Sequence, residues 1–289
     1  MCSSDLGTIV GRMEGAFKDA PIVMTGSHFD SVKNGGNFDG QAGVVAAIEV
    51  ARVIKEQGIK LKHPVEFVAM IEEEGARFIK GLFGSRAMAG HITREQLNNY
   101  KDEDNICMAQ AMRDLGFDPD KIHEAVRTPE TLKAFIELHV EQGPILENNK
   151  KEIGIVNYIA GIKTMNIIIV GRADHAGTTP MAMRVDALGA AVLVIKKIEE
   201  IAKKIGNNTV ATVGKMNIYP GSSNVVPGRV EFTVDIRSSE SKLIDQVVKE
   251  IISEISKISK IRKVKYEIQE KASVSPVKLS DDIIEIITI

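Results

Sequence analysis

Two short apolar runs separated by a helical pattern constrain the fold of the first half of the chain. Residues 22–26 (IVMTG) and 65–71 (VEFVAMI) have the length and composition of buried strands. Residues 43–57 between them are rich in Ala and Val and predict a helix that ends at Gly58. This order indicates a parallel sheet covered by helices, and such sheets bind ligands beyond the carboxyl ends of their strands.

A different pattern begins at residue 161. Strands are predicted at 164–170, 209–218, 229–236 and 264–268, and helices at 184–205 and 242–258. The order βαββαβ is the ferredoxin-like plan. We therefore predict a second domain at residues 161–271, and a first domain made of residues 1–160 and 272–289.

The composition argues against several classes of function. Lys and Arg number 37 against 39 Asp and Glu, so the net charge of −2 gives no electrostatic footprint for nucleic acid. No apolar run approaches the roughly 20 residues that a membrane span needs. The two cysteines, Cys2 and Cys107, form neither a disulfide framework nor a metal-binding spacing. We expect a cytoplasmic protein that binds neither nucleic acid nor membranes.

Residues with metal-binding side chains gather where the predicted strands end. His28 follows the first strand, Glu72–Glu74 follow the second, His139 ends a short strand that begins at residue 135, and Asp39 lies in a Gly-rich loop. Nitrogen and oxygen ligands without thiolates suit zinc, manganese, cobalt or nickel. The Asp39 carboxylate could bridge two metal ions. Asp30 is placed to accept a hydrogen bond from the second ring nitrogen of His28.

Each of these residues also has a plainer interpretation. A lone His after a strand is often an ordinary polar residue, a run of Glu is usually a solvated face, and Asp in a Gly-rich loop often stabilises a turn. Their coincidence at the strand ends of one sheet favours the metal site. Arg237, on the polar face of its strand, could bind a carboxylate or pair with Asp235 or Glu231.

Several motifs in order resemble one family along nearly the whole chain. These motifs are GSHFDSV at 26–32, GGNFDG at 35–40, EEEGARF at 72–78, GSR at 84–86, ELHVEQGP at 137–144, ADHAGTTPM at 173–181, NVVPG at 224–228 and DIR at 235–237. The chain resembles the N-carbamoyl-L-amino-acid hydrolases, β-ureidopropionases and allantoate amidohydrolases. This family is a branch of the dinuclear-metal peptidase superfamily.

The resemblance implies a fold and a set of residue roles. The fold would be a three-layer α/β/α peptidase-like catalytic domain with an inserted ferredoxin-like lid and dimerisation domain. The implied metal ligands are His28, Asp39, Glu74 and His139, with Asp39 bridging the two ions. Glu73 would be the general base, and His175 could donate to the oxyanion or be a plain turn residue before a helix. Residues that contact substrate would be Gln142, His175, Asn224 and Arg237, in part from the partner in a homodimer.

The reaction implied is hydrolysis of the linear amide bond of N-carbamoyl-L-amino acids, with water activated by two metal ions and Glu73. Allantoate amidohydrolase is the alternative within the same chemistry. The family's last metal ligand is a His in a Gly-rich segment, and no His follows His175 here. Regular pattern starts only near residue 8, and residues 281–289 start an amphipathic helix and stop within its pattern, so we expect part of a longer enzyme that is truncated at both ends. A third hypothesis is therefore an inactive chain that retains only the fold and the lid interface.

Overall fold

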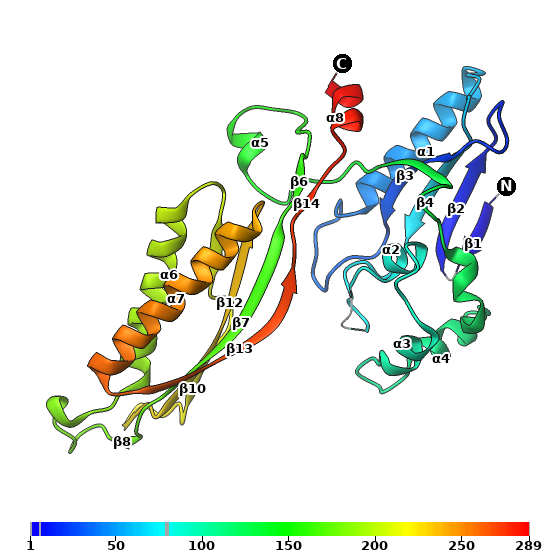
Figure 1. The fold of residues 1–289 in the computed structure, drawn as a ribbon. Coiled ribbons are helices and arrows are strands. Elements are labelled where there is room, and N and C mark those ends of the chain that lie inside the picture. The colour runs from blue at the N-terminus through cyan, green and yellow to red at the C-terminus, as the bar shows by residue number, and fades with distance from the viewer. Residues whose placement is uncertain (1, 6, 79–80, 289) are drawn as a thin grey trace. The chain divides into compact units, whose positions relative to one another are not determined.

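The chain forms two compact units, Met1–Gly154 and Ile155–Ile289, drawn in Figure 1. The computed structural model describes residues 2–5, 7–78 and 81–288. None of the helices within these ranges is both long and apolar enough to cross a membrane.

The first unit is built on a five-stranded mixed sheet. Its order is β1 (Cys2–Asp5), β2 (Thr8–Met13), β4 (Val65–Met70), β3 (Ile22–His28) and β5 (Leu132–Ile136). The strand β3 runs parallel to both β4 and β5, which confirms the predicted parallel arrangement. The two N-terminal strands add an antiparallel edge that the sequence did not predict. His28 is in register with Met70, so β3 and β4 end side by side.

Helices of the first unit fall into two groups. The predicted helix at 43–57 is α1 (Gln41–Glu56), which contacts β3 and β4 through Gly43 and Ala47. Several short helices form a small cluster with its own apolar core around Leu97 and Ala109. Its members are α2 (Phe83–Met88), α3 (Arg94–Asn99), α4 (Met108–Asp114) and the 3₁₀ helix η1 (Pro119–Ala125). A short helix, α5 (Ile145–Asn148), follows the sheet.

The second unit has the predicted βαββαβ order. Its antiparallel sheet runs β10 (Met216–Tyr219), β12 (Arg229–Ser238), β7 (Gly161–Val170) and β13 (Lys265–Val274). The helices are α6 (Ala187–Ile205) and α7 (Ser241–Arg262), and Figure 1 shows both on one face of this sheet. This strand order is that of a ferredoxin-like fold.

One strand prediction in this unit is wrong in detail. Residues 209–218 form two short strands, β9 (Val210–Thr212) and β10, instead of one. Both pair with β12, at different positions along it. Between them, the carbonyl of Lys215 accepts a hydrogen bond from Thr233 N at 3.0 Å, so the chain bulges here and resumes the ladder afterwards.

Short elements complete the second unit. Four pairs of residues form two small ladders, in which β8 (Asp174–His175) pairs with β11 (Val225–Val226), and β6 (Tyr158–Ile159) pairs with β14 (Val277–Lys278). The turn η2 (Met181–Met183) precedes α6, and α8 (Asp281–Thr288) ends the described chain. The predicted helix at the C-terminus is thereby confirmed.

Apolar side chains alternate along the central strands of the second unit and bury one face. Phe232, Val234 and Ile236 of β12 are buried against the two helices, whereas Thr233 and Arg237 occupy the other face. The helix α7 contributes residues at three- and four-residue steps, namely Ile244, Val247, Ile251, Ile255 and Ile258. This packing confirms the predicted amphipathic pattern.

The observed division of the chain differs from the expected domain limits. It falls between Gly154 and Ile155, and the segment after residue 271 continues β13 and then pairs β14 with β6, inside the second unit. The expected return of residues 272–289 to the first domain stays a prediction.

The core of the second unit predicts the effect of truncating one α7 side chain. Ile255 is 0% exposed, so Ile255→Ala should leave a cavity and lower the free energy of unfolding by about 2–5 kcal/mol. Ile261, on the same helix, is 77% exposed, and Ile261→Ala should change it by less than about 0.5 kcal/mol. Urea unfolding followed by circular dichroism measures both, and equal losses would contradict this packing.

Candidate metal centre

Three of the four predicted ligands meet at one edge of the first sheet. His28 is the last residue of β3, Asp39 lies in the loop before α1, and His139 follows β5. The Nε2 atoms of His28 and His139 are 3.2 Å apart, and Asp39 Oδ1 lies 3.7 Å from the first and 3.2 Å from the second. One ligand atom from each residue lies within 4.8 Å of the others, which is a spacing that could hold a metal ion.

The hydrogen bonds of the two imidazoles define which nitrogen faces this centre. His28 Nδ1 lies 2.8 Å from the main-chain oxygen of Asp30, and His139 Nδ1 lies 2.9 Å from that of Val140. A carbonyl oxygen can only accept, so each Nδ1 carries the proton and each Nε2 presents a lone pair. Two lone pairs and a carboxylate facing one another repel unless a cation lies between them, so the donor set fits a divalent metal ion.

The position of Asp39 depends on the glycine that follows it. Gly40 has φ of 75°, a left-handed conformation that favours glycine. A Cβ atom at Gly40 would lie 2.4 Å from both Nδ1 and the main-chain oxygen of His28. A side chain here would therefore push the loop away from His28 and move Asp39 out of the centre.

Gln142, predicted to contact substrate, lies against the same carboxylate. Its Nε2 donates to Asp39 Oδ1 at 3.1 Å and to Oδ2 at 3.0 Å. The amide thus holds both oxygens of the Asp39 carboxylate by hydrogen bonds in this structure. Its predicted contact with substrate stays a prediction.

The three consecutive glutamates point to three different places. Glu72 has φ of 55°, and its Oε1 accepts hydrogen bonds from the main-chain N–H groups of Arg77 and Phe78. Glu74 is directed toward the centre, with Oε1 3.8 Å from His28 Nε2. Glu74 therefore faces the candidate metal, whereas the Glu72 carboxylate is held within a hydrogen-bonded turn.

Asp30 differs in detail from its expected role. Its carboxylate is 3.8 Å from His28 Nδ1, while its main-chain oxygen holds that nitrogen. The carboxylate instead accepts hydrogen bonds from the main-chain N–H groups of Glu73 at 3.0 Å and Glu74 at 2.9 Å. Asp30 therefore orients His28 through its backbone and ties the end of β3 to the turn after β4 through its side chain.

Glu73 is held by a residue to which the sequence assigned no role. Its Oε1 accepts a hydrogen bond from Ser85 N and its Oε2 accepts one from Ser85 Oγ, both at 2.6 Å. Burial raises the pKa of Glu73, the charge of Asp30 raises it further, and the hydrogen bonds from Ser85 oppose both. A carboxyl group with a raised pKa suits a general base near neutral pH. The GSR motif at 84–86 was the available signal for Ser85.

The second unit brings two other predicted residues together. His175 in β8 pairs with Val225 in β11, and Ala176 N donates to the main-chain oxygen of Asn224 at 2.9 Å. His175 Nδ1 accepts hydrogen bonds from the main-chain N–H groups of Gly177 at 3.0 Å and Thr178 at 3.3 Å. Since Nδ1 is an acceptor, Nε2 of the neutral ring carries the proton and can donate.

Arg237 lies far from these two residues within one chain. Val170 pairs with Arg229, so β8 and β11 lie at the Arg229 end of β12, and Arg237 is eight residues further along the strand. At about 3.3 Å per residue the separation is about 26 Å. The guanidinium of Arg237 donates from Nε to Asp235 Oδ1 at 2.8 Å, which is the surface pair considered from the sequence.

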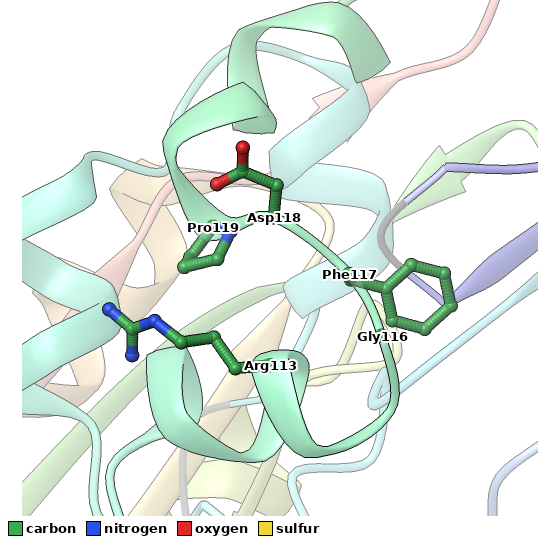
Figure 2. Close-up of a pocket in the computed structure, with 5 residues that line it drawn as sticks. All are labelled: Arg113, Gly116, Phe117, Asp118 and Pro119. Atoms are coloured by element: carbon green, nitrogen blue, oxygen red, sulfur yellow. The ribbon is translucent and has the colours of Figure 1, made fainter.

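The pocket shown in Figure 2 lies elsewhere in the first unit, at the turn between α4 and η1. It is open, has a volume of about 330 Å³, and is lined by Arg113, Gly116, Phe117, Asp118 and Pro119. None of these lining residues is a predicted site residue. The candidate metal centre is therefore identified from the spacing of its donor atoms and not from this pocket.

Comparison with known proteins gives one family. The model of peptidase family M20/M25/M40 matches residues 24–288. The N-carbamoyl-L-amino-acid amidohydrolase of Paenarthrobacter aurescens is 44% identical over 97% of this chain and 68% of its own length, and that of Geobacillus stearothermophilus is 46% identical over 95% and 67%. The allantoate amidohydrolase of Bacillus subtilis (strain 168) is 34% identical over 96% and 67%.

A solved structure shows the same similarity. An amidase of the hydantoinase/carbamoylase family from Burkholderia multivorans superposes with a TM-score of 0.90 at 34% identity, over 99% of this chain and 70% of its own. The chain thus spans about two thirds of the length of these relatives. These matches confirm the resemblance inferred from the motifs.

The donor set predicts that removing one imidazole weakens metal binding. His139→Ala should lower the affinity for Zn²⁺ or Co²⁺ more than about 100-fold, because second-sphere losses alone cost 10–100-fold. His123→Ala, an exposed His on η1, should leave it unchanged. Calorimetric titration and the visible absorption of bound Co²⁺ measure this, and equal affinities for the two variants would exclude His139 as a ligand.

Proposed function

The chain belongs to peptidase family M20/M25/M40, and we propose that it hydrolyses the linear amide bond of N-carbamoyl-L-amino acids. One observation carries this proposal, namely the convergence of His28, Asp39 and His139, with the partly buried carboxylate of Glu73 in the turn after β4. Three relatives that bear this activity in their names are 43–46% identical to the chain, and a fourth is 34% identical.

The residues around the centre suggest how two ions would be held. His28, Asp39 and His139 would bind one ion, and Asp39 would share a second ion with Glu74. Bound zinc, manganese, cobalt or nickel would polarise the carbamoyl carbonyl and lower the pKa of water in the site. Nitrogen and carboxylate donors suit all four metals. The 3.8 Å between Glu74 Oε1 and His28 Nε2 supports a common site.

Glu73 would move the proton in this reaction. The water oxygen bonds to the carbamoyl carbon as its proton passes to the Glu73 carboxylate. The C–N bond then breaks, and the proton is delivered to the leaving nitrogen. Burial, which raises the pKa of Glu73, favours both halves of this transfer. This cleavage leaves a carbamic acid, whose remaining C–N bond breaks as carbon dioxide is lost, so ammonia, carbon dioxide and the free amino acid are the products.

The second unit would act as an inserted lid that recognises substrate. His175 Nε2–H would donate to the developing oxyanion, with Asn224 beside it, while Arg237 would bind the substrate carboxylate. A ureido acid cannot span the separation of about 26 Å along β12. We therefore infer a homodimer in which one subunit provides Arg237 and its partner provides His175 and Asn224.

Allantoate is the second candidate substrate, since the relatives with that activity in their names are 34% identical to the chain. Allantoate also carries a ureido group and a carboxylate, so the same residues would serve. The higher identity to three N-carbamoyl-L-amino-acid amidohydrolases, at 43–46%, favours the first substrate class.

Ammonia release by the metal-loaded chain tests this function. N-carbamoyl-L-amino acids should be hydrolysed faster than allantoate, and Glu73→Gln should lower kcat by about 10²–10⁴-fold, the usual contribution of general acid–base catalysis. The metal content of this variant should not change.

Glu72→Gln is the matched control. Its amide oxygen can still accept the N–H groups of Arg77 and Phe78, so kcat should be retained. A Glu73→Gln variant that turns over at the unsubstituted rate would show that the base is assigned to the wrong residue. A fully metal-loaded chain that releases ammonia from neither substrate would contradict the proposed activity and favour a non-catalytic role.

Substitution of Arg237 is expected to have a separate effect, on substrate affinity. Arg237→Ala removes a charge-assisted hydrogen bond to the substrate carboxylate and should raise KM about 10–100-fold with little change in kcat. Arg229→Ala, which breaks a comparable surface pair with Glu231 on the same strand, is the control. Steady-state kinetics that give the same KM for both variants would remove Arg237 from the substrate site.

A further inference from the structure

The segment 82–85 is docked onto the turn that carries the three glutamates. Three successive N–H groups bond to three successive carbonyls, from Leu82 to Glu73 at 2.7 Å, from Phe83 to Glu72 at 3.1 Å, and from Gly84 to Ile71 at 3.1 Å. The next N–H group, that of Ser85, has no carbonyl left to meet in this row and donates to the Glu73 carboxylate. The docking therefore delivers Ser85 to one side chain.

Ser85 holds this carboxylate at both oxygens. The main-chain N–H contacts Oε1 and the hydroxyl contacts Oε2, each at 2.6 Å. The other acceptor near the hydroxyl, the carbonyl of Leu82, is 3.4 Å away, so the single hydroxyl proton belongs to Glu73. Two contacts on two oxygens define the plane of the carboxylate as well as its position.

Gly84 makes the approach possible. A Cβ atom there would lie 2.9 Å from the carbonyl oxygen of Ile71 and 3.0 Å from Glu73 Oε1. Any side chain at this position would separate segment 82–85 from the turn. The pair Gly84-Ser85 thus combines a close approach with a donor at the point of contact.

We propose that Ser85 is a positioning residue that aims the Glu73 carboxylate for proton transfer. The proposal rests on the proposed function, in which Glu73 is the general base. Asp30 holds the main chain of Glu73 and Glu74. Ser85 removes the remaining freedom, the rotation of the side chain, so that the proton acceptor stays at one place in the site.

The test compares Ser85→Thr with Ser85→Val, which have the same shape and differ only in the hydroxyl. Ser85→Thr should keep kcat within about threefold of the unsubstituted chain. Ser85→Val should lower kcat by about 10–100-fold, the scale expected when a catalytic group is misplaced. KM and metal content should be equal in the two variants. Equal kcat values for the two would overturn the proposal.

Crystal structures of the same two variants test the positioning without turnover. The Glu73 carboxylate should keep its place in Ser85→Thr and rotate away in Ser85→Val, and an unmoved carboxylate in Ser85→Val would overturn the proposal. If the unsubstituted, metal-loaded chain hydrolyses no ureido acid, the proposed function fails while these structures still decide the role of Ser85 as the anchor of Glu73.

Discussion

The parallel pairing of β3 with β4 is the constraint on which the rest of the site depends. Because His28 is in register with Met70, the imidazole and the glutamate turn leave the sheet at the same edge. The Asp30 carboxylate then joins the two strand ends by accepting the N–H groups of Glu73 and Glu74. A shift of one residue in this register would turn His28 to the other face of the sheet and remove its imidazole from the candidate metal centre.

Electrostatics gives this edge its chemical character. Two imidazole nitrogens with outward lone pairs, one shared carboxylate and a further glutamate converge there, and the hydrogen bonds around them leave a position that suits a cation. The other acidic groups accept hydrogen bonds from nearby residues, Glu72 from main-chain N–H groups and Glu73 from Ser85. This arrangement separates a carboxylate proposed to bind metal from one proposed to exchange a proton.

The two units divide the proposed chemistry between them. The first carries the metal ligands and the base, and the second carries an imidazole with a defined N–H donor and an arginine at the opposite end of one strand. The helix-facing side of the second sheet is buried, while its polar side displays Arg237, which is proposed to bind the substrate carboxylate. The separation of Arg237 from His175 within one chain is the physical argument for the proposed dimer.

Much of this organisation could be predicted from residue patterns alone. Apolar runs and periodicity identified the strands β3, β4 and β12 and the helices α1, α6 and α7, because burial of a face leaves a local pattern in the sequence. The types and strand-end positions of His28, Asp39 and His139 likewise predicted their convergence. The antiparallel edge β1–β2 and the break between β9 and β10 were missed, since hydrogen-bond pairing with distant strands defines them.

Hydrogen-bond partners were beyond prediction for the same physical reason. That Asp30 holds His28 through its main-chain oxygen and that Ser85 holds Glu73 depend on distances set by the packing of segments. Local sequence establishes which chemical groups a segment offers and which face they occupy. Which of those groups meet is a property of the folded chain, because a hydrogen bond requires an approach within a few tenths of an ångström.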